Sequence, residues 1–408
     1  MAISERSTPL RLAPASRRKR PAPAAEATVA LHRPSFTGRE WHYLRQCLDS
    51  GWVSAAGPFG GRFERAVAAY VGVRHAVATV TGSAALHVAL QLVGLRPGEA
   101  VIVPDLTFIA PLHAVRQCGG DPVLIDAEAE TWQIDPDLVE AYLREDCVTR
   151  HGRTSDRRSG RRVRALVATH LLGLPCAIER LVEVARRHGL AVVEDAAQAI
   201  GVRVRDRHVG TFGDVGVLSF NGNKIVTAGG GGMLVTGDDR LAERARRVIH
   251  QGSGDAGRRG RGELAFNYRL SSLQAALGLA QLEQLDAFLS RQRRIAGRYA
   301  RALRALAGVV PMPAPRHARP SYWLYAMRLA ERRVGARDAV IRRLAAQGVE
   351  AKSLWRPMHA LPANRSYRRR GGEQAARLYA QTICLPCRPG LTDAEQDLCI
   401  RAVEAAVQ

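Results

Sequence analysis

Short apolar runs rich in β-branched residues alternate with helical patterns from about residue 30 onward. This alternation predicts an α/β fold built on a largely parallel sheet. Most of the runs are apolar at nearly every position, which is typical of strands that helices cover on both faces. The expected strands are residues 76–80, 100–104, 122–125, 163–169, 190–194, 215–220 and 232–236.

The chain has 408 residues, a length that suggests about two domains. We expect a large domain over residues 31–306, which ends with a long helical region from 271 to 306. Prolines interrupt the pattern after that region, and residues 307–408 mix strand-like and helical segments, so we expect a smaller α+β domain there. Residues 1–30 are rich in Pro, Ala and Arg and are expected to form a disordered basic tail.

The formal net charge of +22 comes partly from this tail and partly from the Ser-, Gly- and Arg-rich stretch from Arg150 to Arg164. No nucleic-acid-binding motif accompanies the charge, so we do not expect specific nucleic-acid binding. No run approaches the ~18 apolar residues of a membrane span, and no apolar segment of a secretory signal follows the basic cluster. Seven scattered cysteines, only one pair of which has CxxC spacing, favour reduced thiols and no metal site. We therefore expect a cytoplasmic protein.

Lysine occurs at three positions, Lys19, Lys224 and Lys352, although the chain contains 60 basic residues. An arginine at position 224 would supply charge equally well, which suggests that Lys224 is needed for its amine. A lysine amine can lose its proton and form a Schiff base with an aldehyde, whereas a guanidinium cannot. Codon bias that happened to spare this position is the alternative, and lysine scarcity alone does not decide between the two.

A phosphate-binding turn is suggested by Thr81-Gly82-Ser83-Ala84, between an expected strand and an expected helix. The free backbone N–H groups of Ser83 and Ala84 would point at an anion at the helix N-terminus. An ordinary helix cap is the alternative.

Other polar and aromatic side chains follow the expected strands. Asp195 can hold a protonated pyridinium nitrogen, or it can cap the next helix. Gln198 can donate to a ring oxygen or face solvent, and the Ser219 hydroxyl can bind phosphate. Phe108 can stack on a flat ring or belong to the core. Together with the amine of Lys224 and the phosphate turn, this set describes a pyridoxal phosphate site.

The ordered blocks of the chain resemble the DegT/DnrJ/EryC1/StrS family of sugar aminotransferases, from about Arg33 to the last helix. The resemblance implies the fold-type I architecture of aspartate aminotransferase. The blocks are Gly51-Trp52-Val53-Ser54, Thr81 to Leu86, Pro104 to Phe108, Glu194-Asp195-Ala196-Ala197-Gln198, Ser219 to Gly232 and Asn267-Tyr268-Arg269-Leu270.

By this resemblance Lys224 forms the internal aldimine and shuttles the proton, Asp195 contacts the ring nitrogen and Gln198 lies near the ring hydroxyl. The resemblance also implies that the phosphate is bound by Ser83, Ala84 and Ser219 and that Phe108 stacks on the ring. Asn267 is expected to reach the phosphate of the neighbouring subunit, which implies an obligate homodimer with shared sites. His170 matches a family position near the active site, and His170, Tyr322 and Trp355 are the weaker substrate candidates.

The block from Ser219 to Gly232 looks like the subgroup that aminates UDP-4-keto-6-deoxy-N-acetylhexosamines in the bacillosamine and legionaminic acid pathways. We therefore expect ping-pong transfer of an amino group from L-glutamate to C4 of such a sugar. Amination at C3 of a dTDP-3-keto sugar is an alternative. A dehydratase of the same family would carry His in place of Lys224. From a different class, a non-catalytic regulator could bind DNA through the basic tail. The tail and residues 147–162 have no assigned counterpart in the family.

Overall fold

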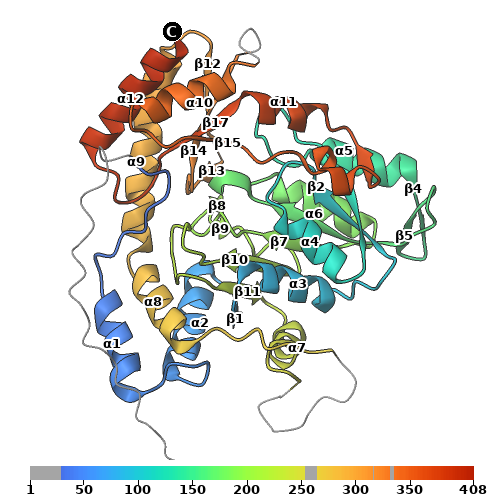
Figure 1. Cartoon of the computed structure of the whole chain (residues 1–408). Coiled ribbons are helices and arrows are strands. Elements are labelled where there is room, and N and C mark those ends of the chain that lie inside the picture. Colours follow the sequence, from blue (N-terminus) through green and yellow to red (C-terminus); the bar gives the residue numbers. More distant parts are fainter. Residues whose placement is uncertain (1–28, 253–263, 316, 331–334) are drawn as a thin grey trace, which may run out of the picture.

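The computed structural model describes residues 29–252, 264–315, 317–330 and 335–408 and centres on an eight-stranded sheet (Figure 1). The strand order is β1-β11-β10-β7-β6-β2-β3-β16, and all neighbours pair in parallel except those of β11, which runs antiparallel to both β1 and β10. The expected largely parallel sheet is therefore confirmed. The strands are β1 (His75–Thr79), β2 (Ala100–Pro104), β3 (Asp121–Ile125), β6 (Val163–Thr169), β7 (Ala191–Asp195), β10 (Val215–Ser219), β11 (Gly232–Thr236) and β16 (Arg368–Arg370).

Helices bury both faces of this sheet, as the apolar strands require. Successive side chains of a strand point to opposite faces, so Val101 and Val103 join one core cluster and Ile102 joins the other. The first cluster includes side chains of α3 (Gly82–Leu92), α4 (Ala110–Gln117) and α7 (Asp239–Ile249). The second includes side chains of α1 (Glu40–Ser50), α2 (Pro58–Val71), α5 (Pro136–Ala141), α6 (Ile178–Arg187) and α8 (Ser272–Leu282).

The helical region expected over residues 271–306 consists of two helices. Helix α8 begins with a capping box in which the Ser271 hydroxyl accepts from the backbone N–H of Gln274, while the Gln274 side chain accepts from the Ser271 backbone. Helix α8 ends at Leu282, and α9 (Leu285–Arg304) follows after a two-residue break. In Figure 1, α9 runs from the region of the central sheet to the C-terminal elements.

The C-terminal elements form a second, antiparallel sheet with the order β12-β14-β17-β15. Strand β16 also lies within residues 307–408, yet it pairs in parallel with β3 at the edge of the central sheet. The segment expected to form a separate domain therefore returns once to the large sheet. Its other elements include β12 (Val309–Pro311), β14 (Tyr325–Leu329), β15 (Lys352–Ser353), β17 (Thr382–Leu385), α10 (Arg337–Ala346), α11 (Glu373–Gln381) and α12 (Asp393–Val407).

Two regions without an assigned family counterpart have different outcomes. Residues 147–162 contain a hairpin of β4 (Cys147–Arg150) and β5 (Arg153–Asp156). Residues 1–28 of the expected tail lie outside the described residues, while Val29 is buried and forms a bridge with Val349.

A search of the described ranges for helices that could span a membrane finds none of sufficient length and hydropathy. A small three-stranded sheet joins β8 (Arg203–Val204), β9 (Arg207–His208) and β13 (Ala318–Arg319).

Candidate active site

A cavity of about 260 Å³ opens where the central strands end. Strands β1, β2, β6, β7 and β10 all run in one direction, so their carboxyl ends share one edge of the sheet, where ligands of α/β folds bind. Most of the residues expected to bind cofactor line this cavity. They are Ser83, Phe108, Asp195, Gln198, Ser219 and Lys224, joined by the substrate candidate Trp355.

One end of the cavity is suited to an anion. Helix α3 begins at Gly82, and the Ser219 side chain lies so close that a Cβ at Gly82 would sit 3.0 Å from the Ser219 Cβ. The helix N-terminus and the Ser219 hydroxyl therefore face the same space, where the helix dipole favours negative charge.

The structure corrects one part of the phosphate prediction. The Thr81 hydroxyl caps α3 by accepting from the backbone N–H of Ala84 at 3.0 Å. The Ala84 N–H is therefore already satisfied within the turn, and Ala84 is not among the residues that line the cavity. Ser83 does line it, so the helix cap and the phosphate site, posed as alternatives, are both compatible with this turn.

Asp195 ends β7 with its side chain almost fully buried. Burial raises the pKa of this carboxyl group, while the Ala197 N–H at 3.1 Å from Oδ1 and the charge of Lys224 lower it. The net effect raises the Asp195 pKa, and a cationic ring nitrogen in the cavity would oppose this rise, because an opposite charge favours the carboxylate.

Lys224 lies across the cavity in the loop after β10. Burial lowers the pKa of its amine to about 8, against the opposing attraction of Asp195. The amine is thus close to the protonation balance that a nucleophile and proton carrier needs near neutral pH. Its Nζ lies 4.2 Å from the centre of the Trp323 ring.

The orientation of the Gln198 amide is fixed by the backbone of the turn after β6. Its Oε1 accepts a hydrogen bond from Leu172 N–H at 2.7 Å. Because a backbone N–H can only donate, the oxygen must face Leu172, and the side-chain NH₂ is left to donate toward the cavity that Gln198 lines.

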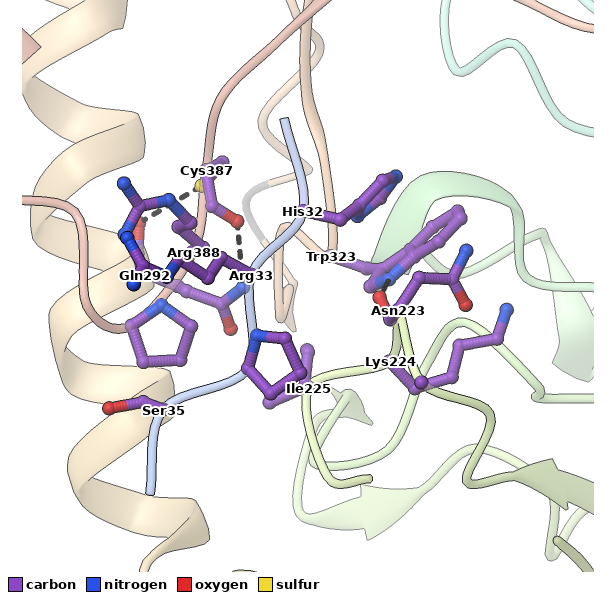
Figure 2. Close-up of a pocket in the computed structure, with 13 residues that line it drawn as sticks. His32, Arg33, Ser35, Asn223, Lys224, Ile225, Gln292, Trp323, Cys387 and Arg388 are labelled. Carbon is purple, nitrogen blue, oxygen red and sulfur yellow. Dashed lines mark hydrogen bonds between the residues drawn. The ribbon is translucent and has the colours of Figure 1, made fainter. Parts of the chain in front are cut away.

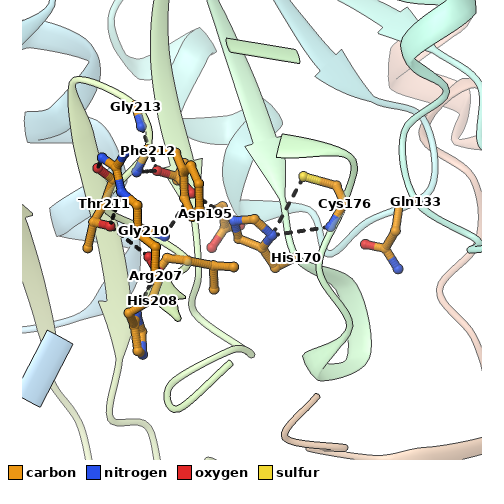
Figure 3. A network of polar contacts seen from close by, with 12 residues as sticks. Gln133, His170, Cys176, Asp195, Arg207, His208, Gly210, Thr211, Phe212 and Gly213 are labelled. Atoms are coloured by element: carbon orange, nitrogen blue, oxygen red, sulfur yellow. Dashed lines mark hydrogen bonds and ion pairs between the residues drawn. The ribbon is translucent and has the colours of Figure 1, made fainter. Parts of the chain in front are cut away.

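His170 is not at the cavity surface, contrary to its proposed place near the substrate. It is fully buried, and Figure 3 shows it between Cys176 and the network around β7. Its Nε2 lies 3.0 Å from Glu194 Oε2, and its Nδ1 accepts from Cys176 N–H at 3.3 Å. No substrate can touch a side chain enclosed in this way, so His170 holds the strand ends rather than the substrate.

The Glu194 carboxylate next to Asp195 was not among the predicted site residues. Both of its oxygens are occupied, since Oε1 accepts from Phe212 N–H and Gly213 N–H and Oε2 from Gly210 N–H. Burial opposes ionisation, but the His170 contact and these amide donors lower the Glu194 pKa. The pair Glu194 and His170 thus joins β7, β6 and the loop before β10 directly behind Asp195.

An aromatic wall closes the other side of the cavity. Phe108 is 48% exposed, and its ring centre lies 6.3 Å from that of Trp355 in an edge-on arrangement. Tyr322, the remaining substrate candidate, does not line the cavity, and its neighbour Trp323 does. Tyr322 has φ +50°, in the left-handed region that residues other than glycine seldom adopt.

Asn267 does not line the cavity of its own chain. Its Oδ1 accepts from Arg269 Nε at 3.1 Å, and its backbone bridges His250. Its expected contact with the phosphate of a neighbouring subunit stays a prediction.

Several known proteins resemble this chain in sequence and in fold. Residues 34–404 match the model of the DegT/DnrJ/EryC1/StrS aminotransferase family. The chain is 38% identical to a GDP-perosamine synthase of Caulobacter vibrioides, covering 92% of this chain and 97% of the relative. It is 35% identical to the putative pyridoxal phosphate-dependent aminotransferase EpsN of Bacillus subtilis, with coverages of 90% and 93%. The crystal structure of the aminotransferase TlmJ from Streptoalloteichus hindustanus superposes with a TM-score of 0.84 at 30% identity, covering 93% of this chain and 99% of that one.

Proposed function

Because the chain belongs to the DegT/DnrJ/EryC1/StrS aminotransferase family, we propose that it transfers an amino group from L-glutamate to C4 of a GDP-linked 4-keto-6-deoxyhexose. The coarser activity, pyridoxal phosphate-dependent amination of a nucleotide sugar, follows from the family and its relatives. The observation that carries the proposal is the cavity in which the Lys224 amine and the Asp195 carboxylate lie at the ends of neighbouring strands.

The donor groups of the cavity fit pyridoxal 5′-phosphate. The N-terminus of α3, Ser83 and the Ser219 hydroxyl would hold its phosphate, Asp195 its ring nitrogen, and Gln198 its ring oxygen through the side-chain NH₂. Phe108 supplies an exposed ring face for stacking. When bound, the cofactor supplies an aldehyde that condenses with amines and a ring that withdraws electrons from the carbon losing its proton.

In this assignment Lys224 first holds the cofactor and is then set free when the amine of glutamate replaces it. The free Lys224 amine would then take the proton from the α-carbon of glutamate and deliver it to C4′ of the cofactor, the carbon that keeps the transferred amino group. Asp195 stays ionised throughout and keeps the proton on the ring nitrogen. Asp195 is buried and Lys224 is only partly exposed, which limits the competition of bulk water for these protons.

The first experiment is an absorbance spectrum of purified protein and of Lys224→Arg, before and after addition of L-glutamate. Wild type should show the visible band of a lysine-bound cofactor, which glutamate should shift. The Arg variant keeps the charge but cannot condense with an aldehyde, so its band should be absent. A Lys224→Arg protein with the wild-type band and turnover would remove Lys224 from its role.

The nucleotide sugar is tested with a panel of keto sugars. The motif around Lys224 favours a UDP-linked 4-keto-6-deoxy-N-acetylhexosamine, whereas the name of the Caulobacter vibrioides relative favours a GDP-linked sugar. We give more weight to the relative because its 38% identity extends over 92% of the chain and not over one loop. The highest kcat/KM is expected with the GDP-linked 4-keto sugar. A higher kcat/KM with the UDP-linked 4-keto sugar, or with the dTDP-linked 3-keto sugar, would overturn this choice.

We also propose a homodimer in which Asn267 completes the phosphate site of the partner. Its absence from the cavity of its own chain supports this, as do the exposed side chains of Trp41 and Trp52, which leave apolar surface for a second copy. Mixing inactive Lys224→Arg chains with Asn267→Asp chains would form hybrids with one intact site. Activity should recover toward a quarter of wild type on mixing, and no recovery in a confirmed dimer would refute shared sites.

A further inference from the structure

Trp323 lies between the N-terminal segment and the reactive lysine. Figure 2 shows its indole between the His32 ring and the Lys224 side chain. The rings of Trp323 and His32 are stacked, with centres 5.3 Å apart and an interplanar angle of 24°. The Lys224 Nζ lies 4.2 Å from the Trp323 ring centre, well within the range of a cation–π contact. Trp323 is also stacked with Trp355, with the ring centres 6.1 Å apart.

Hydrogen bonds hold the indole in this place. Trp323 Nε1 donates to the carbonyl oxygen of Asn223 at 2.7 Å, the residue next to Lys224. The preceding turn is tied to the central sheet because Ser321 N–H donates to the carbonyl of Gly173 at 3.0 Å. Gly173 has φ +78°, and a Cβ there would lie 2.4 Å from Ser321 Oγ and 2.8 Å from Trp323 N. The close fit leaves the ring little freedom to move away from the amine.

The N-terminal segment is also fastened on the outer side of the ring. Val29 N–H donates to the carbonyl of Gly348 at 2.7 Å, and Leu31 N–H donates to Glu350 Oε2 at 2.9 Å. Burial and the charge of Lys352 lower the pKa of His32 to about 4. The imidazole is therefore neutral near pH 7, so it supports the indole without repelling the amine.

We propose that Trp323 is a positioning residue for the Lys224 amine, which it holds on its indole face whenever the amine is not bonded to cofactor, and that His32 supports the ring from behind. The inference rests on the assignment of Lys224 as the cofactor-binding amine. During turnover the amine is released and must stay close to the carbon whose proton it moves. A fixed aromatic face beside it keeps a mobile four-carbon side chain near the reacting atoms.

Several charged and titratable groups share this environment and could alter the same titration. Asp195 faces the amine from the end of β7, and His170 lies behind Asp195. On the other side of the indole are His32 and the ion pair of Glu350 and Lys352, and the adjoining pocket also contains Arg33 and Arg388. A test must therefore change the ring face and leave all of these groups in place.

Site-specific replacement of Trp323 by tryptophans with one, two and three ring fluorines makes this change. Fluorine withdraws electrons from the ring face and weakens its attraction for a cation, while the shape and the Nε1–H remain. The readout is the rate at which cofactor-free protein captures pyridoxal 5′-phosphate, measured against pH. Capture needs the neutral amine, which adds to the aldehyde with loss of water, so the midpoint of the profile reports proton loss from Lys224.

The midpoint should fall stepwise with each fluorine, by about one pH unit over the series, because the ring face no longer favours the protonated amine. The same fluorination of Trp132, an equally buried ring that does not line the cavity, is the matched control and should leave the midpoint unchanged. If fluorination of Trp323 leaves the midpoint of the pH profile unchanged or raises it, the inference is overturned.

His32 is tested by a variant and its rescue. In His32→Ala the indole loses its support, and we expect at least a few-fold slower proton transfer in the reaction with glutamate, seen as a larger effect of α-deuterated glutamate on kcat. His32→Phe restores a flat ring and should restore the wild-type isotope effect. Equal values in wild type and both variants would remove His32 from the proposal.

Lys224→Arg separates failure of this inference from failure of the proposed function. If the Arg variant captures no cofactor but fluorination has no effect, Lys224 keeps its assignment and only the role of Trp323 is refuted. If the Arg variant captures cofactor as wild type does, the assignment of Lys224 is refuted as well.

Discussion

Glu194→Gln is the substitution that most directly tests the network behind Asp195. The amide has almost the same shape as the carboxylate but offers one acceptor oxygen in place of two. In wild type, one oxygen serves Phe212 N–H and Gly213 N–H, and the other serves Gly210 N–H and faces His170 Nε2. Whichever way the amide turns, its NH₂ faces two donors that lose their acceptor.

The expected loss of stability follows from those two donors. Leaving a buried donor without a partner costs about 1–3 kcal/mol, so the substitution should lower the free energy of unfolding by about 2–6 kcal/mol. Urea unfolding followed by circular dichroism measures this change. The matched control is Glu183→Gln, the same chemical change at a side chain that is 71% exposed on α6, which should alter stability by less than about 0.5 kcal/mol.

The pH dependence has a definite sign. The folded pKa of Glu194 is lowered, so its carboxylate stabilises the fold above the unfolded pKa of about 4.3, and that contribution disappears as pH falls through the folded value. The difference between wild type and Glu194→Gln should therefore be largest near pH 7 and should shrink in acid. A difference below about 1 kcal/mol at pH 7 would refute the argument that both carboxylate oxygens are required.

Three further outcomes can be checked on the same protein. Cofactor capture by cofactor-free wild type should accelerate as pH rises through about 8, because the Lys224 pKa is lowered to that value and only the neutral amine reacts. A capture rate that does not change between about pH 6 and 9 would contradict this expectation. Gly173→Ala places a Cβ against Ser321 and should lower both the melting temperature and the rate of cofactor capture, with a destabilisation of about 1–3 kcal/mol. Thr81→Val removes the cap of α3 and should cost about 0.5–2 kcal/mol in urea unfolding, and an unchanged midpoint would show that the cap contributes nothing.

The sequence predicts the strands and several of the residues that line the cavity at their ends, because both depend on local pattern. Uniformly apolar runs identify buried parallel strands, and a parallel sheet places their carboxyl ends at one edge. Asp195 and Ser219 are the last residues of β7 and β10, so their place in the cavity follows from strand assignment alone.

Side-chain partners from distant parts of the chain could not be predicted in this way. The rotamer of Thr81 decides which backbone N–H of the phosphate turn is used to cap helix α3. In the structure the Thr81 hydroxyl accepts from the Ala84 N–H, so that N–H is not free. The position of Trp323 over Lys224 depends on a contact across about a hundred residues, and its only local sign is an aromatic pair after a proline-rich break. His170 matches a family block, but the sequence pattern could not show that its ring is buried and hydrogen-bonded to Glu194.

Strand β16 has a consequence for recombining this chain with its relatives. The polypeptide leaves the central sheet to form β12 and β14, comes back to lie beside β3, and leaves again for β17. A graft that exchanges everything after residue 307 would also replace one edge strand of the recipient's main sheet. Modular exchange of the C-terminal sheet therefore needs three junctions, one near residue 307 and two flanking the returning strand, so that the native edge strand is retained.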